Sequence, residues 1–241
     1  MKTYHFSSVM VLLFVAFASV SCNEASAVVG RGAIRTETRV VSAFSSIDLR
    51  SHARVVIKKG DTFKVEVSDY ENLLPHIEIK SDGKTLTVDS KGSVNIINSK
   101  TSIDITMPDP LYQIAIQGSG DFYVDSPYKD LESISIAGSG NVTSDVPMEL
   151  NELKVKIAGS GDVALKGSAT KVNATIAGSG NIYLSRLAVG EAECLILGSG
   201  DIEIKVLNNL NAKINGSGDI RYSGNPASEI RVNGSGKIEK I

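Results

Sequence analysis

The sequence predicts an all-β protein, a parallel right-handed β-helix (a solenoid) whose coils are each about 20 residues long. Three observations lead to this prediction. The triplet Gly-Ser-Gly recurs along the second half of the chain, usually followed by Asp or Asn. A β-branched residue always stands two places before it, and apolar and polar residues alternate on both sides. The triplets begin at residues 118, 138, 159, 178, 198, 216 and 234.

The β-branched column indicates how the coils stack. Ile136, Ile157 and Ile176 occupy equivalent positions in successive copies. One strand pair cannot bury its apolar face alone, so the copies must stack, and parallel stacking at about 4.8 Å per coil places like residues above like residues. Parallel crossovers are right-handed as a rule. A period of about 20 residues is too short for a propeller blade, and the consensus of leucine-rich repeats is absent.

The triplet itself predicts a sharp corner between two short strands in every coil. Glycine adopts positive φ without steric cost, and its missing side chain lets neighbouring coils approach closely. Both properties would explain the glycines, and the sequence does not say which glycine is left-handed. In the last copy Lys237 and Lys240 replace the acidic or amide residue and the apolar residue, which is typical of a protected end of a sheet.

Residues 34–110 show the same alternation without the triplet, and we expect a less regular β part of one elongated structure. Runs such as Ile47-Asp48-Leu49 predict its strands. Asp82-Gly83-Lys84 predicts the turn of an antiparallel hairpin. Pro108-Asp109-Pro110 is the expected seam, after which residues 111–241 form the triplet β-helix.

The N-terminus predicts export. Residues 1–21 have a short charged head and an apolar run, as in a secretory signal peptide, and the run is too short for a permanent membrane span. Cys22 stands where a bacterial lipoprotein carries its lipid, followed by a linker at 22–33. We therefore expect an outer-membrane-anchored lipoprotein. Cleavage after Ala25-Ser26-Ala27 would instead release a soluble periplasmic or secreted protein.

Composition excludes several classes of function. The net charge is −2, without a basic run, which argues against a nucleic-acid partner. The two cysteines cannot form a disulfide framework, and His5, His52 and His76 are too scattered for a zinc site. The triplet serines have no fixed His or acid partner, and no phosphate-binding glycine motif precedes a helix. We therefore expect no catalytic site, no metal and no cofactor.

The residue after each triplet forms a column that is a candidate binding site. Its carboxylate and amide oxygens suit calcium or sugar binding, but Asp and Asn also follow glycine because they hydrogen-bond the local backbone, which is the interpretation we favour. Cys194 falls in an apolar column and predicts a buried thiol. Tyr123, Tyr128, Tyr183 and Tyr222 offer rings for sugars, although ordinary packing explains them too. The column consists of Asp121, Asn141, Asp162, Asn181, Asp201 and Asp219.

Segments such as Ile157-Ala-Gly-Ser-Gly-Asp-Val163 and Ile196-Leu-Gly-Ser-Gly-Asp-Ile202 resemble the putative auto-transporter adhesin, head GIN domain family of exported Bacteroidetes proteins. The resemblance covers the chain from about residue 34 to its end and implies a β-helical fold in the cell envelope. It provides no catalytic or ligand residues to transfer, and the sequence contains no recognisable translocator barrel.

The main functional hypothesis is therefore a non-enzymatic surface lipoprotein that binds a glycan or protein partner. Two alternatives stay open, a carbohydrate-active β-helix enzyme and a structural or sensory envelope module. An enzyme of that kind needs long loops around a groove, whereas the triplet spacing stays within 18 to 21 residues. Oligomers through the solenoid ends also stay open.

Overall fold

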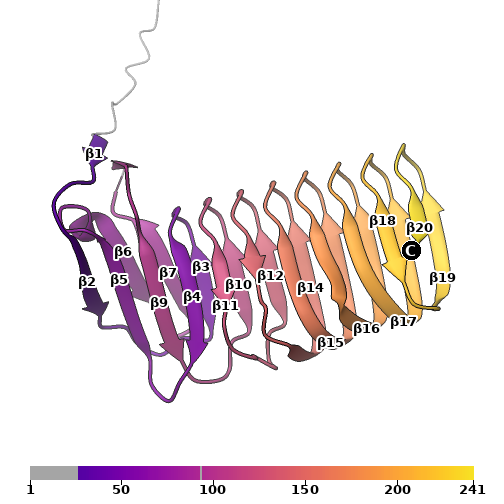
Figure 1. The fold of residues 1–241 in the computed structure, drawn as a ribbon, viewed down its shortest axis with the longest axis horizontal. Coiled ribbons are helices and arrows are strands. Elements are labelled where there is room, and N and C mark those ends of the chain that lie inside the picture. Colours follow the sequence, from indigo (N-terminus) through magenta and orange to yellow (C-terminus); the bar gives the residue numbers. More distant parts are fainter. Residues whose placement is uncertain (1–26, 93) are drawn as a thin grey trace, which may run out of the picture.

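The computed structural model describes residues 27–92 and 94–241 and shows one elongated β-solenoid (Figure 1). The all-β prediction with coils of about 20 residues is confirmed. The predicted signal peptide, residues 1–21, and the predicted lipid-bearing Cys22 lie outside the described residues. Apart from the separate short pair of β1 (Ala27–Val29) and β8 (Asn95–Ile97), the strands form two sheets. We call the strands before each triplet corner the pre-corner sheet and the strands after it the post-corner sheet.

The pre-corner sheet is parallel except at one end, where β6 and β7 form an antiparallel hairpin. The turn of this hairpin is Asp82-Gly83-Lys84, as the sequence predicts. In order of pairing the sheet contains β6 (Ile77–Ser81), β7 (Thr85–Ser90), β3 (Ser46–Leu49), β10 (Gln113–Ile116), β12 (Ser133–Ile136), β14 (Met148–Ile157), the C-terminal parts of three longer strands, and β19 (Ala227–Val232).

The post-corner sheet is antiparallel over its first three strands and parallel thereafter. In order of pairing it contains β2 (Ile34–Arg39), β5 (Lys64–Tyr70), β9 (Ser102–Met107), β4 (Arg54–Lys59), β11 (Phe122–Val124), β13 (Val142–Thr143), the N-terminal parts of the same longer strands, β18 (Ile220–Ser223) and β20 (Ile238–Lys240).

Three strands run through both sheets: β15 (Val163–Ile176), β16 (Ile182–Ile196) and β17 (Ile202–Ile214). The expectation of two short strands per coil is wrong for these coils, because pairing with the neighbouring coil continues around the second bend. A register shift between Ala164 and Lys166 marks this bend in β15. Only the triplet corner interrupts the strands there.

The spatial order of the coils differs from their order in the sequence. Strands β3 and β4 form one coil that lies between the coil of β7 and β9 and the first triplet coil, β10 and β11. After residue 59 the chain therefore leaves this coil and forms the N-terminal end of the solenoid. It returns at residue 113 on the other side of the β3–β4 coil. Residues 46–59 thus pair directly with the triplet array.

The interior consists of aliphatic ladders. Ile136 pairs with Ile157, and Ile157 pairs with Ile176, each at most 1% exposed. This confirms the predicted stacking of equivalent residues, and burial stabilises the fold by about 1.5–3 kcal/mol for each such side chain. In the last coil Ile230 and Val232 remain 42% exposed.

The corner glycines owe their presence to close packing and not to positive φ. The glycines with positive φ among the described residues are Gly32, Gly83, Gly92, Gly167 and Gly224, none of which belongs to a triplet. A Cβ on Gly159 would instead overlap the carbonyl oxygen of Gly138 in the preceding coil, and the same overlap recurs along the array. The expectation of a left-handed glycine in the triplet is therefore wrong, whereas the expected close approach is correct.

The remaining elements lie at the N-terminal end. β1 (Ala27–Val29) pairs with β8 (Asn95–Ile97), and η1 (Leu74–His76) joins β5 to β6. Figure 1 places β1 and β2 at the end of the solenoid opposite β19 and β20. Within the described residues, no helix is long and apolar enough to span a membrane.

Candidate functional site

The predicted Asp and Asn column forms a hydrogen-bonded ladder along the edge of the corners. Each side-chain Oδ1 accepts the backbone N–H of the equivalent residue in the next coil at 2.7–2.9 Å. The favoured interpretation, backbone hydrogen bonding, is right in kind, but the bonded amide belongs to the neighbouring coil and not to the local turn. The ladder runs through Asp121, Asn141, Asp162, Asn181, Asp201, Asp219 and Lys237.

The two asparagines make a second contact in this ladder. Nδ2 of Asn141 donates to Oδ1 of Asp121 at 2.8 Å, and Nδ2 of Asn181 donates to Oδ1 of Asp162 at 2.9 Å. Alternating Asn with Asp therefore separates the negative charges of adjacent coils, since like charges at this spacing repel. No group of three His, Cys, Asp or Glu side chains in the described part of the chain is arranged to hold a metal ion.

Two aspartates of the column, Asp201 and Asp219, are adjacent without an intervening Asn. Arg221 lies beside them, with its guanidinium 3.6 Å from the Asp201 carboxylate and 3.4 Å from that of Asp219. The same guanidinium also lies within 3.7 Å of Glu203 and 3.5 Å of Glu239. The positive charge of Arg221 thus offsets the repulsion between Asp201 and Asp219, which no asparagine separates.

Cys194 is buried, as predicted, between Ala174 and Ala212 of the flanking coils. Burial, with a smaller contribution from Glu193, raises the pKa of its thiol to about 12. A thiol with so high a pKa is not a nucleophile at neutral pH. Its position among aliphatic side chains therefore indicates a packing role.

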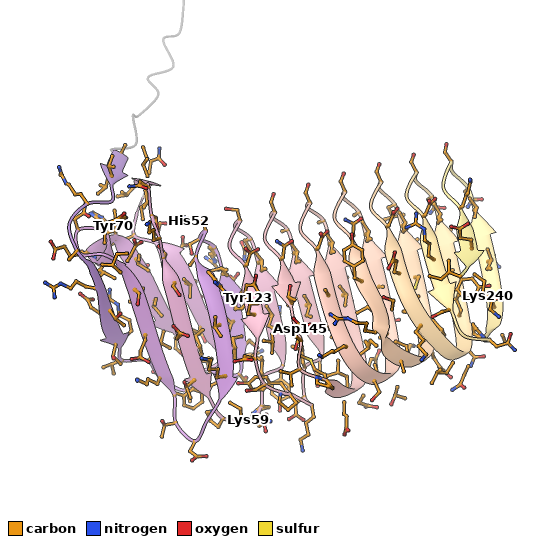
Figure 2. All side chains as sticks on the ribbon, in the orientation of Figure 1. His52, Lys59, Tyr70, Tyr123, Asp145 and Lys240 are labelled. Atoms are coloured by element: carbon orange, nitrogen blue, oxygen red, sulfur yellow. The ribbon has the colours of Figure 1, made fainter. Side chains whose placement is uncertain are left out.

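The four candidate tyrosines divide into three groups, one of which is Tyr222 alone, partly buried against the core. Tyr128 is buried, and burial and the nearby Asp109 raise the pKa of its phenol, so it does not offer a ring to a ligand. Tyr123 and Tyr183 are 41% and 39% exposed on the outer side of the post-corner sheet. The guanidinium carbon of Arg54 lies 4.6 Å from the ring centroid of Tyr123, which is labelled in Figure 2.

The outer side of the pre-corner sheet carries a hollow that the sequence analysis did not identify. Its volume is about 500 Å³, and strands β7, β3, β10 and β12 provide its floor. Asp48 lines it, and although its position faces outward, the residue is only 8% exposed. The lining comprises Ser46, Ile47, Asp48, Arg50, Asp82, Thr85, Thr87, Gln113, Ala115, Ile116, Gln117, Ser135 and Ala137.

Two side chains hold the Asp48 carboxylate in place. Nε2 of Gln117 lies 3.1 and 2.9 Å from its two oxygens, and Nε of Arg50 donates to Oδ2 at 2.8 Å. The hydrogen bond to Asp48 raises the pKa of the Arg50 guanidinium. Gln117 is 69 residues from Asp48 in the sequence, so only the pairing of β3 with β10 brings the two together.

Comparisons with known proteins agree with this architecture. The family described as "Putative auto-transporter adhesin, head GIN domain" matches residues 43–226. No curated protein matches the chain. A putative adhesin from Bacteroides fragilis is similar in structure, with a TM-score of 0.81 and 25% identity over 89% of this chain and 100% of its own.

Two solved structures from Parabacteroides are also similar, each 26% identical over 90% of this chain and 100% of their own. One is a putative lipid binding protein from Parabacteroides distasonis, with a TM-score of 0.77. The other is a putative adhesin from Parabacteroides merdae, with a TM-score of 0.67. All three matches cover both the irregular N-terminal part and the triplet array.

Proposed function

Because the chain belongs to the putative auto-transporter adhesin, head GIN domain family, we propose that it is an exported, non-enzymatic adhesin. Its solenoid presents an outer face to a glycan or protein partner. The observation that carries this proposal is the hollow around Asp48, because a carboxylate, an amide and a guanidinium converge there on the outer surface of the pre-corner sheet. The stacked coils make that surface a rigid platform.

The hydrogen bonds that the acidic side chains already accept within the protein support a non-enzymatic role. The Asp and Asn column is occupied with backbone amides of neighbouring coils. Asp48 is held by Gln117 and Arg50. A general acid or base needs a carboxyl group that is free to exchange a proton with the substrate, whereas these carboxylates already accept hydrogen bonds from donors within the protein. They suit recognition better than proton transfer.

We further propose that residues 1–21 are removed on export and that Cys22 is lipidated, with residues 22–33 joining the lipid to the solenoid. The family description, auto-transporter adhesin, supports export. β1 and β2 lie at one end of the solenoid, so a lipid on Cys22 would hold this end near the membrane (Figure 1). The triplet array would then extend away from the bilayer.

Metabolic labelling with a palmitate analogue tests the anchor. The parent chain should take up label and partition with membranes, whereas Cys22→Ala should do neither. Unlabelled parent protein in the soluble fraction would overturn the lipoprotein assignment and leave cleavage after Ala27 as the explanation.

Bead adhesion tests the binding role. Beads coated with the purified full-length chain are scored for retention on arrayed glycans and matrix proteins, and Ile157→Asp, which places a carboxylate in the interior, provides the unfolded control. Saturable retention with the arrayed glycans left intact supports the proposal. Two results overturn it: retention no greater than with the control beads on every surface, or glycan cleavage that disappears when one carboxylate is replaced.

A further inference from the structure

The outer side of the pre-corner sheet carries one column of residues in which each coil contributes one side chain. In pairing order this column runs through Thr87, Asp48, Ala115, Ser135, Lys156, Thr175, Leu195, Lys213 and Arg231. Most of the later coils carry long side chains there. Around Asp48 the neighbours Ala115 and Ser135 are short, so the surface falls away and the hollow forms.

A second column of equivalent residues, directly before the corner, also changes its residue type at the hollow. Gln117 stands where the following coils have Ala137, Ala158 and Ala177. The glutamine amide is the group that reaches both oxygens of Asp48. The hollow thus depends on three local departures from the array: the carboxylate of Asp48, the short side chain of Ala115 and the amide of Gln117.

The groups around the hollow are fixed before any ligand arrives. Asp48 is 8% exposed and accepts hydrogen bonds from Arg50, which follows β3, and from Gln117, which follows β10, so its carboxylate cannot rotate freely. Nε of Arg50 is used for Asp48, which leaves the terminal nitrogens of its exposed guanidinium available as donors. Polar groups that are already fixed lose little conformational entropy when a ligand binds.

The chemistry of the lining selects the ligand class. Hydroxyls from Ser46, Thr85, Thr87 and Ser135 alternate with the amide of Gln117 and with charged groups. The charged groups are two carboxylates, Asp48 and Asp82, and one guanidinium, that of Arg50, so the lining has a net charge of −1 (one positive, two negative). This balance disfavours phosphates and acidic sugars, while closely spaced donors and acceptors match a ligand with many hydroxyl groups.

We propose that this hollow binds a neutral sugar unit of a glycan, with Asp48 and Gln117 accepting from its hydroxyls and Arg50 donating to its oxygens. The volume of about 500 Å³ lies within the range of small-ligand sites, roughly 300–1,000 Å³. The inference rests on the proposed adhesin function and makes it specific, because it names the ligand class and the residues that contact it.

The solenoid provides matched variants for the test. Ala115→Leu fills the hollow, and Leu195 shows that the same column accommodates leucine in a later coil. Thr175→Leu makes the same kind of change in that column outside the hollow. Gln117→Ala removes the amide, and Ala137 shows that alanine is accommodated there. Circular dichroism and thermal melting check that all three variants remain folded.

The purified full-length chain and each variant are titrated on an array of neutral and acidic oligosaccharides. The parent and Thr175→Leu should bind the same neutral glycans with equal affinity. Ala115→Leu should raise the Kd about tenfold or more, the effect of losing roughly 1.4 kcal/mol of binding free energy. Gln117→Ala should weaken binding by about three- to tenfold, because one hydrogen-bonding group is lost.

The outcomes separate this inference from the adhesin proposal. Equal binding by Ala115→Leu and Thr175→Leu would overturn the site and leave the adhesin function standing. Binding of acidic glycans alone, or of no glycan while beads are still retained on a matrix protein, would overturn the ligand class. Failure of the bead assay on every surface would overturn the adhesin function itself.

Discussion

Asp162 accepts two hydrogen bonds from Asn181 in the next coil, one from the backbone N–H at 2.7 Å and one from Nδ2 at 2.9 Å. Asp121 and Asn141 repeat the arrangement two coils earlier. Asparagine suits the position of Asn181 because its Nδ2 donates to the carboxylate of the preceding coil, while its Oδ1 accepts the backbone N–H of Asp201 in the following coil. The ladder therefore links each coil to the next at a point where the strand pairing is interrupted by the corner.

We expect Asp162→Ala to destabilise the corner by about 1–2 kcal/mol, because the backbone N–H of Asn181 loses its partner. Asp162→Asn keeps an oxygen acceptor and should cost less. Hydrogen exchange at the Asn181 amide measures the effect locally, and the exchange should be faster in the alanine variant alone. Equal protection of this amide in the parent and both variants would contradict the role assigned to the ladder.

Gly159→Ala should prevent correct stacking of the coils, because the added Cβ would overlap the backbone carbonyl of Gly138. The matched variant Ser160→Ala changes the exposed middle residue of the same triplet and should leave stability within about 0.5 kcal/mol of the parent. Urea denaturation and soluble yield compare the two variants. A cost of only about 1 kcal/mol for Gly159→Ala would show that the coils separate easily at the corner.

The sequence predicted the repeating part of the fold well because one constraint recurs in every coil. Equivalent residues such as Ile136 and Ile157 face the interior and pair directly. The glycines were harder to interpret, because a position that requires close packing and a position that requires positive φ are both occupied by glycine. Only the position of the preceding coil distinguishes the two causes.

The position of the β3–β4 coil was not predicted, although the sequence carries a signal for it. Leu49 and Val55 are separated by the same six positions as Ile116 and Phe122, with which they pair. Ser51 and Ala53 stand where the triplet coils have glycine. A side chain is tolerated there because the coil on the other side, β7 and β9, has a longer corner, from residue 91 to 101.

The hollow was missed for a related reason. Asp48 belongs to the run Ile47-Asp48-Leu49, in which only the apolar residues were used to predict a strand. Its importance depends on Gln117, and the spacing that Leu49 and Val55 share with the triplet coils does not by itself indicate that β3 lies beside β10. A site made by residues from two distant segments requires the topology first.

Cys194 should be unreactive in the folded protein, because burial raises its thiol pKa to about 12. In a Cys22→Ala background, a thiol reagent should modify Cys194 only after denaturant unfolds the chain. Cys194→Ala should be tolerated, since Ala174 and Ala212 occupy the same column. Modification of the native protein at the rate of a free thiol would show that the coils open locally at this position.

Asp69 should make the N-terminal end of the solenoid sensitive to acid. Burial alone would raise its pKa, but hydrogen bonds from the Thr101 hydroxyl, the Lys100 amide, the Ser99 hydroxyl and the Tyr70 amide outweigh burial and hold the pKa below its ordinary value of 3.8. The donors lie 2.6–3.0 Å from the carboxylate oxygens. The charged form therefore stabilises the fold.

A carboxyl group with a lowered pKa in the folded state contributes stability above its unfolded pKa, and this contribution disappears as the pH falls through the folded pKa. Asp69→Asn has no such group. We expect it to be less stable than the parent near neutral pH and the difference to shrink as the pH falls below 3.8. Thermal melting of both proteins across this range measures the difference. A constant difference at every pH would mean that the pKa of Asp69 is the same in the folded and the unfolded chain, because only a pKa that differs between the two states makes stability depend on pH.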